Sequence, residues 1–363
     1  MTNISLGFGR IAFKFGTLIA FLAILAGTPV QAAEEGSESS FVMHHIKDSY
    51  DWHLIDINHH PVSVPLPVIL YNKGTGFDVF MSSAFHHDNA GKVPVEAGKN
   101  TYLKYHEKIY LANADGDLTF DDAGHPTNAR PMLDLSITKN VFFSIITAII
   151  VLWVFLSVAS KYKKYGVAAP SGVQSLLEPV ILFVRDDIAI PNIGKQKHER
   201  FMPYLLSVFF FIWFANLLGL FPGAANLTGN IAVTFTFAFI TFLITNFSGN
   251  KHYWNHIFNT PGVPWWLKFG IPIMPIVEFI GIFTKPFSLM VRLFANITAG
   301  HIIILSIIGL IFIFKSAVIG VVSVPFAAAM TFLELLVAFI QAYVFTLLSA
   351  IYIGGAVEEA HDH

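Results

Sequence analysis

Residues 275–315 read PIVEFIGIFTKPFSLMVRLFANITAGHIIILSIIGLIFIFK, and after Ser316 a second apolar segment extends over residues 317–354. At 1.5 Å per residue, a helix of about 40 residues is roughly 60 Å long, about twice the thickness of the hydrocarbon layer of a bilayer. Such helices must tilt strongly, bend or project from the membrane. The two segments therefore predict a long, tilted hairpin of membrane helices that turns near Ser316.

Ionisable and amide side chains interrupt both segments. A charged side chain at the bilayer centre costs about 2.5–3.5 kcal/mol on insertion scales, so an ionisable residue inside a membrane segment predicts a functional site. Arg292 is the strongest candidate, because apolar sequence continues well beyond it and its guanidinium cannot simply reach a headgroup. The interrupting residues are Glu278, Lys285, Ser288, Arg292, Asn296 and His301 on the first segment and Glu334 and Gln341 on the second.

Five of these residues share one stripe of the first helix. Glu278, Lys285 and Arg292 are seven residues apart, which is nearly two helical turns. Ser288 and Asn296 lie four residues to either side of Arg292 on the same stripe. Glu278 and Lys285 are nearer the cytoplasmic end, where they either line an inner entrance or face lipid headgroups.

The second segment offers a partner for each of two residues on the first. In an antiparallel hairpin, the register that brings Arg292 level with Gln341 also brings His301 level with Glu334 to within two positions. Because two independent pairs fit one register, we expect a polar seam between the helices.

The residue types in this seam indicate its chemistry. An arginine is not deprotonated in a protein, so Arg292 acts as a fixed positive charge, and Gln341 can accept a hydrogen bond from it. His301 and Glu334 can both titrate, so they form either a proton relay or a static ion pair that sets the helix register. No mid-membrane carboxylate in this chain stands opposite Arg292 as a mobile counter-ion, and we expect another subunit to supply one.

Three further segments, residues 140–160, 201–220 and 230–247, are long and apolar enough to span a bilayer. Together with the hairpin they predict an all-α integral membrane region of five transmembrane helices over residues 140–357.

Loop charges predict the orientation of these helices. Lys161, Lys163 and Lys164 follow the first span directly, and the positive-inside bias places that end in the cytoplasm. Within residues 170–200, apolar side chains repeat at helical spacing, which predicts a cytoplasmic surface helix. The last six residues, 358–363, then form a cytoplasmic tail.

The N-terminal region predicts an exported domain. Residues 1–33 have the basic start, short apolar run and small residues of a secretory signal peptide, with an uncleaved short anchor as the alternative. Residues 34–139 are polar, alternate in hydrophobicity and contain frequent turn residues, which predicts a small β-rich extracytoplasmic domain. The expected strands are residues 53–57, 62–71, 77–81 and 102–111.

This domain is rich in histidine. The side chains either bind a metal or gather protons near an outer entrance, or they are ordinary surface and strand histidines. Residues 113–122 resemble a calcium loop only faintly, because Gly124 stands where the closing glutamate should be, and we expect an acidic turn. The histidines are His44, His45, His53, His59, His60, His86, His87, His106 and His125.

Composition agrees with a membrane protein and excludes several other classes. Of the 363 residues, 54% are hydrophobic and 13% charged, against about 25% charged in ordinary soluble domains. The mean hydropathy is +0.61. A net charge of −2 gives no support for a nucleic-acid partner, and the absence of cysteine excludes disulfides, thiolate metal sites and a cysteine nucleophile.

Three motifs resemble one family. Residues 284–300, TKPFSLMVRLFANITAG, resemble the signature S-K-P-x-S-L-x-x-R-L-F-x-N-x-x-A-G of subunit a of F-type ATP synthases. Residues 340–348, IQAYVFTLL, resemble the last-helix motif of that family, and residues 214–222, FANLLGLFP, resemble an earlier helix. The resemblance extends over roughly residues 161–358, with the motifs in family order.

The resemblance implies a role for each site residue. Arg292 would be the essential stator arginine that faces the carboxylate of each passing c-ring subunit and blocks a leak between two aqueous half-channels. Asn296 and Gln341 would assist Arg292. His301 and Glu334 would line the outer half-channel, whereas Glu278 and Ser288 would lie toward the inner one.

The resemblance also implies a setting. The chain would be a non-catalytic subunit without a cofactor, in the inner membrane of a bacterium, with a periplasmic N-terminal domain and a cytoplasmic C-terminus. Its partners would be the c-ring, the peripheral-stalk subunit b, the rest of the ATP synthase and the lipid bilayer.

Two departures from the family pattern bear on the site. Many bacterial members have an acidic residue at the position of His301 and a histidine at that of Glu334, so the pair is exchanged here, which predicts a contact between the two positions. Gly219 stands where some members have Asp. Two other classes remain open from the residues alone: a stand-alone secondary ion transporter, and an assembly or anchoring protein with a purely structural seam.

Overall fold

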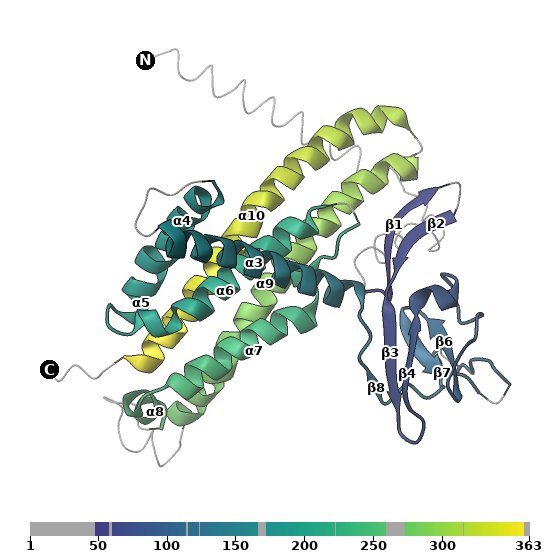
Figure 1. Cartoon of the computed structure of the whole chain (residues 1–363), viewed down its shortest axis with the longest axis horizontal. Helices are drawn as coiled ribbons and strands as arrows, with labels where there is room; N and C mark the ends of the chain where they lie inside the picture. The colour runs from purple at the N-terminus through teal and green to yellow at the C-terminus, as the bar shows by residue number, and fades with distance from the viewer. Residues whose placement is uncertain are drawn as a thin grey trace, which may run out of the picture. The chain divides into compact units, whose positions relative to one another are not determined.

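The computed structural model describes residues 48–57, 60–113, 115–122, 124–165, 172–221, 223–258, 273–314 and 316–358 (Figure 1). The predicted signal peptide, residues 1–33, lies outside the described residues, as do His44, His45, His59 and the tail beyond Glu358. The described chain is mostly helical and carries strands in its N-terminal region.

The described strands of the N-terminal region form three antiparallel sheets. The first sheet pairs β1 with β2, the second has the order β4-β3-β8, and the third has the order β5-β6-β7. The strands are β1 (Asp51–Ile57), β2 (His60–Pro65), β3 (Pro67–Asn72), β4 (Gly76–Met81), β5 (Val95–Ala97), β6 (Asn100–Tyr105), β7 (Lys108–Leu111) and β8 (Leu133–Asp134). The prediction of a small β-rich region is confirmed.

Two of the predicted strands were wrong, because each is in fact two. The strand predicted over residues 62–71 divides at Leu66, whose backbone bonds to Ser82 rather than to a neighbouring strand, and both flanking prolines lack an N–H group. The strand predicted over residues 102–111 is a hairpin that turns at His106 and Glu107, whose φ angles of 48° and 57° suit a two-residue hairpin turn. The short strands β5 and β8 were not predicted.

Five helices of the described chain are long and apolar enough to cross a membrane, as the sequence predicts. They are α3 (Lys139–Tyr165), α6 (His198–Gly219), α7 (Ile231–Ser248), α9 (Ile273–Phe314) and α10 (Ala317–Val357). The shorter segments are α4 (Val173–Phe183), the π-helical η2 (Val184–Ala189), α5 (Ile190–Ile193), the 3₁₀ turns η1 (Ser82–Phe85) and η3 (Leu227–Gly229), and α8 (Lys251–Phe258).

The predicted surface segment is helical but is divided into three parts, α4, η2 and α5. Its last part lies against the end of α10, where a Cβ built on Gly354 would come 1.9 Å from the carbonyl oxygen of Asn192. The backbones approach that closely only because residue 354 lacks a side chain. Helix α8 was not predicted, because eight residues of mixed polarity read as a loop.

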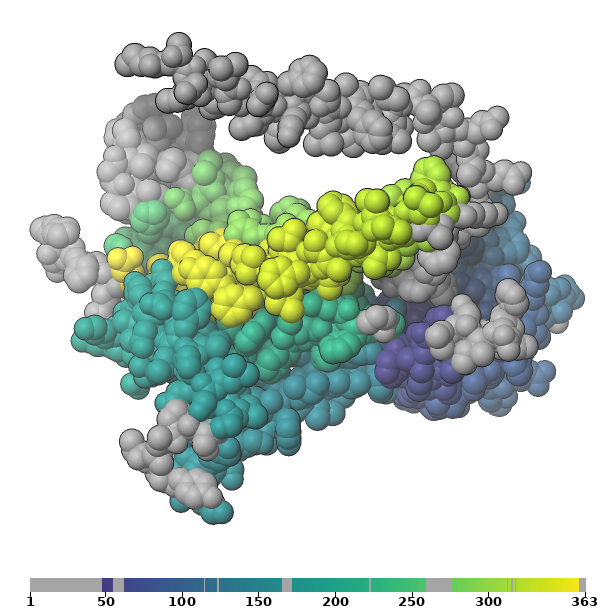
Figure 2. Space-filling view, turned by 90° about the horizontal axis from the view of Figure 1, so that it is seen from above, coloured from purple at the N-terminus to yellow at the C-terminus, as the bar shows by residue number. Residues whose placement is uncertain are grey.

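The predicted hairpin is α9 followed by α10, which are 42 and 41 residues long and are separated at Ser316. The two helices lie side by side, and α10 runs along the face of the molecule seen in Figure 2 (Figures 1 and 2). Their adjacent faces carry the site residues.

Helix α6 packs between α3 and α10. Its buried Phe209 and Phe210 form edge-to-face ring contacts with Phe339 of α10 and Phe155 of α3, at centroid distances of 5.7 and 5.0 Å. Helix α6 thereby fixes where α10 lies, and it brings Gly219 to the polar residues of the hairpin.

Candidate functional site

A histidine and a glutamate face one another inside the hairpin. His301 Nε2 on α9 lies 3.4 Å from Glu334 Oε1 on α10, and their side chains are 19% and 5% exposed. The contact predicted between these two positions is confirmed. Within the described part of the chain, neither carboxylate oxygen of Glu334 receives a hydrogen bond, so the imidazole is the polar group placed to respond to its charge.

Glycines make room for this pair on two sides. A Cβ built on Gly300 of α9 would lie 3.0 Å from Glu334 Oε1, and one built on Gly219 of α6 would lie 3.8 Å from His301 Nε2. Glycine inside a helix costs about 1 kcal/mol relative to alanine. The tight space beside Gly300 is therefore a packing requirement of the His301–Glu334 pair, whereas the distance at Gly219 is an ordinary contact that places α6 beside the pair.

Buried amides and hydroxyls lead from this pair toward the connection between α6 and α7. The buried hydroxyl of Thr228 in η3 donates to Asn216 Oδ1 at 2.5 Å. Asn216 lies one turn before Gly219 on α6, and within the described residues its Nδ2 is buried without a hydrogen-bond partner. We call Asn216, Thr228, His301 and Glu334 the outer polar row. Sequence reasoning missed Asn216 and Thr228, although an asparagine inside an apolar span was a usable signal.

Arg292 lies on an exposed face of α9, nine residues before His301. That face also carries exposed apolar side chains, among them Phe287, 61% exposed, and Val291, 38% exposed. Asn296 and Ser288, one turn to either side, are exposed as well, whereas Gln341 on α10 is buried. Among the described residues no hydrogen bond joins Arg292 to Gln341, whereas the positive charge of Arg292 acts on Tyr352 of α10. The structure thus presents a cation on an apolar surface.

A cavity of ≈ 390 Å³ opens at the other end of this stripe. Its polar lining includes Glu278, Lys285, His252, His256, Tyr253 and Tyr352 from α8, α9 and α10. We call it the inner cavity. Glu278 and Lys285 both line this cavity, and their place at an inner entrance or at lipid headgroups stays a prediction.

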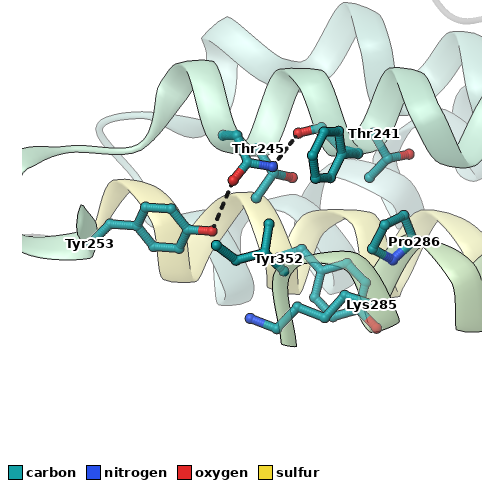
Figure 3. Close-up of a pocket in the computed structure, with 9 residues that line it drawn as sticks. Thr241, Thr245, Tyr253, Lys285, Pro286 and Tyr352 are labelled. Carbon is teal, nitrogen blue, oxygen red and sulfur yellow. Dashed lines mark hydrogen bonds between the residues drawn. The ribbon is translucent and has the colours of Figure 1, made fainter. Parts of the chain in front are cut away.

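A smaller cavity of ≈ 10 Å³, about the volume one water needs, adjoins the inner cavity (Figure 3). Tyr253 donates to Asn246 Oδ1 at 3.3 Å there, and Lys285 Nζ lies 5.7 Å from the centroid of the Tyr352 ring. The buried hydroxyl of Thr245 has no hydrogen-bond partner among the described residues. Burial raises the pKa of Tyr253, and the negative charge of Glu278 raises it further, so that charge acts across the cavity.

Sequence reasoning missed the contribution of α7 and α8 to this end of the site. The buried residues Thr234, Thr241 and Thr245 lie on one stripe of α7, seven and four residues apart, and were a usable signal. Two of the hydrogen-bond partners of Thr241 come from other helices: the Tyr204 hydroxyl lies 2.5 Å, and the Ser349 hydroxyl 3.4 Å, from Thr241 Oγ1.

The described residues bring together no group of three or more His, Asp or Glu side chains that could hold a metal ion. The acidic turn around residues 113–122 is closed by hydrogen bonds of its own, including Asn113 N–H to the Asp117 carbonyl at 3.1 Å.

These features define a class: a multi-pass membrane protein with a titratable histidine–glutamate pair buried between two long helices and an arginine exposed on the face of one of them. Residues 141–354 match the family described as ATP synthase A chain. The chain belongs to this family, and as an ATP synthase subunit a it is the stator subunit of the membrane sector, a multi-pass protein of the inner membrane. Residues 41–135 match a domain of unknown function, DUF8433.

Curated relatives agree over different lengths of the chain. ATP synthase subunit a of Chloroherpeton thalassium is 49% identical over 242 residues, which are 63% of this chain and 71% of the relative. That of Pelodictyon phaeoclathratiforme is 45% identical over 83% of this chain and 93% of the relative. That of Anaeromyxobacter sp. is 39% identical over 92% of this chain and 74% of the relative, which includes most of the N-terminal region.

Proposed function

We propose that the chain provides two proton half-channels that end on either side of Arg292. The observation that carries the proposal is the order of groups along α9. The inner cavity at Glu278 is 14 residues before Arg292 and the buried pair at His301 is nine residues after it, about 21 and 13 Å along a helix. A single fixed cation therefore stands between two separate polar regions.

Arg292 acts on a carboxylate supplied by a neighbouring c-ring. A guanidinium within about 4–6 Å lowers the pKa of a carboxylic acid by roughly 1–3 units, so a ring carboxyl that reaches Arg292 loses its proton. Arg292 keeps its own proton throughout. It therefore cannot pass protons from one half-channel to the other, and each proton must travel with the ring. Asn296 and Gln341 assist by offering hydrogen bonds near the guanidinium.

The outer polar row delivers protons from the periplasm. His301 accepts a proton at its imidazole, passes it to the Glu334 carboxylate across the 3.4 Å contact, and becomes neutral again. From there the proton reaches an ionised ring carboxylate. Because the Glu334 side chain is buried, bulk water does not exchange protons directly with its carboxylate. His301 occupies the space beside Gly219, where some family members have an acidic residue.

The inner cavity receives protons on the cytoplasmic side. Glu278 and the hydroxyl groups of its lining accept the proton that a ring carboxyl releases, and Ser288 lies between the cavity and Arg292 on the same stripe. A cytoplasmic location for the C-terminal end of α3 is supported by its basic residues Lys161, Lys163 and Lys164. The β-rich domain, at the other end of α3, then lies in the periplasm. The segment α4–η2–α5 then lies at the cytoplasmic face, where subunit b of the peripheral stalk is the expected neighbour.

Substitution of Arg292 tests the proposal. In membranes that carry the whole ATP synthase, Arg292→Ala should abolish ATP synthesis driven by a proton gradient, while the amount of assembled complex stays normal. The matched control is Lys163→Ala, which removes an exposed cation at the end of α3 and should leave synthesis unchanged. Coupled synthesis at the normal rate in Arg292→Ala would reject the proposal.

The purified chain in vesicles separates this function from a stand-alone ion transporter. The proposal predicts little proton conduction by the chain alone, because the carboxylate that carries the proton past Arg292 belongs to another subunit. Rapid conduction without a ring would favour the transporter.

A further inference from the structure

The N-terminal β-rich domain matches a family without an assigned function, yet one of its aromatic side chains contacts the connection between α6 and α7 that carries Thr228 of the outer polar row. Trp52 on β1 donates its indole N–H to the carbonyl oxygen of Gly223 at 2.8 Å. Gly223 belongs to the connection between α6 and α7, 171 residues away in the sequence. The domain is thereby fastened to the loop that leads into η3.

Packing reinforces this hydrogen bond. The Trp52 ring contacts Phe143 edge-to-face at a centroid distance of 5.1 Å, and it lies tilted against Phe142 at 5.8 Å. These two residues stand at the start of α3. Trp52 packs onto a buried cluster that also includes Ala225 and Leu227 of the same connection, so the ring joins β1, α3 and the loop in one apolar contact.

The loop backbone can adopt this shape only with glycine at one position. Gly223 has φ +80°, a conformation that side-chain-bearing residues rarely adopt. A Cβ built there would also lie 3.4 Å from the carbonyl oxygen of His53, so β1 passes close against the loop. The close contact between β1 and the loop therefore depends on glycine at position 223.

The same connection carries the outer polar row. Thr228, five residues after Gly223, donates to Asn216, and Asn226 accepts a hydrogen bond from the Gly229 N–H at 3.0 Å. A shift of the loop therefore moves Thr228 relative to Asn216 and disturbs the row that ends at the His301–Glu334 pair.

We propose that Trp52 is a positioning residue for proton entry, and that the β-rich domain serves to hold the α6–α7 connection in the shape that keeps the outer polar row continuous. This inference rests on the proposed function of the row as the outer half-channel. It assigns the domain a place in proton uptake rather than in assembly alone.

Two substitutions of Trp52 test the proposal in membranes that carry the complete complex. Trp52→Phe retains an aromatic ring against Phe143 and loses only the N–H donor, whereas Trp52→Ala loses both. The matched control is Trp153→Phe on α3, because Trp153 is 66% exposed and does not contact the loop. Proton conduction is measured after removal of the soluble sector, divided by the amount of assembled chain, at external pH 6 and pH 8.

The expected result is a fall in conduction per assembled chain of about two- to tenfold in Trp52→Phe, the range that one ordinary hydrogen bond controls. The fall should be larger at pH 8 than at pH 6, because impaired entry limits the flux most when external protons are scarce. A purely structural role would lower the yield of chain and leave conduction per assembled chain unchanged at both pH values.

A second readout follows the loop directly and does not depend on activity. The chain has no cysteine, and Ala225 is fully buried in the loop cluster. A single-cysteine variant, Ala225→Cys, should resist a membrane-impermeant maleimide applied from outside, and should become labelled when Trp52→Ala is added.

Unchanged conduction per assembled chain in both Trp52 variants at both pH values overturns the inference, whatever the labelling shows. If Trp52→Ala does not assemble, the result for Trp52→Phe decides. Arg292→Ala, measured alongside, separates this failure from a failure of the proposed function: if Arg292→Ala abolishes synthesis and the Trp52 variants conduct normally, only the role of the domain is wrong.

Discussion

Exchange of the two buried partners is the sharpest test of the site. In the structure, His301 Nε2 and Glu334 Oε1 are 3.4 Å apart. With an effective dielectric constant of about 20, two unit charges at that distance interact by roughly 5 kcal/mol. The single variant His301→Glu places two carboxylates together, and Glu334→His places two imidazoles together, so each loses the attraction. The double variant restores one acid and one base in exchanged positions.

We expect each single variant to lose most proton conduction, because each removes one of the two different titratable groups between which the proton passes in the proposed relay. The double variant should recover part of that loss. A coupling free energy of about 2 kcal/mol or more between the two substitutions corresponds to a roughly 30-fold recovery relative to additive effects.

Passive proton conduction by stripped membrane vesicles, divided by the amount of chain present, supplies the four values of this double-mutant cycle. A control cycle combines His301→Glu with Gly309→Ala, a position two turns further along α9 where a new Cβ meets nothing within 4 Å. That pair should be additive to within about 0.5 kcal/mol. A double variant as impaired as the sum of its singles would refute the reasoning, because the two groups would then not act as a pair.

Three further substitutions test the packing around the site. Gly300→Ala should displace the buried carboxylate, whose oxygen is 3.0 Å from the new Cβ, and reduce conduction, whereas Gly309→Ala on the same helix meets nothing and should be silent in the same vesicle assay. Gly354→Ala should destabilise the chain by about 1–3 kcal/mol through overpacking against α5, seen as a lower melting temperature in detergent, whereas Gly355→Ala should not. Burial raises the pKa of Asp48, so the stability that this carboxyl contributes is present at low pH and is lost as the pH rises through the raised pKa. Asp48→Asn should therefore raise the melting temperature at neutral pH and leave it unchanged at pH 3. An equal rise at both pH values would contradict this.

The sequence predicted the helices well, because the membrane imposes a simple rule. A spanning helix must satisfy its own backbone hydrogen bonds and be apolar over about 20 residues, so its length and composition are visible in any window. The same rule made Arg292, His301 and Glu334 conspicuous. The ends of the strands were harder to predict. Leu66 separates two strands because its backbone bonds to Ser82, and the local alternation of residues gives no sign of that contact.

The contact between His301 and Glu334 could be predicted from residue numbers alone, because an antiparallel helical hairpin with a known turn has a single register. The relation of Arg292 to Gln341 could not, because Arg292 is exposed whereas Gln341 is buried, and two residues at the same level of a hairpin need not touch. Packing of α7 and α10 against α9 decides which face of α9 remains open.

The sequence by itself thus determined that this chain spans a membrane with five helices and buries a few costly polar groups in the last two. The tertiary structure decided which residues far apart in the sequence meet at and around the site: Gly219 beside His301, Thr228 on Asn216, and Trp52 on Gly223. Hydrophobicity and helical period act over neighbouring residues and can be read along the chain. Contacts between residues far apart depend on how whole elements pack, and that information appears only when the elements are placed together in space.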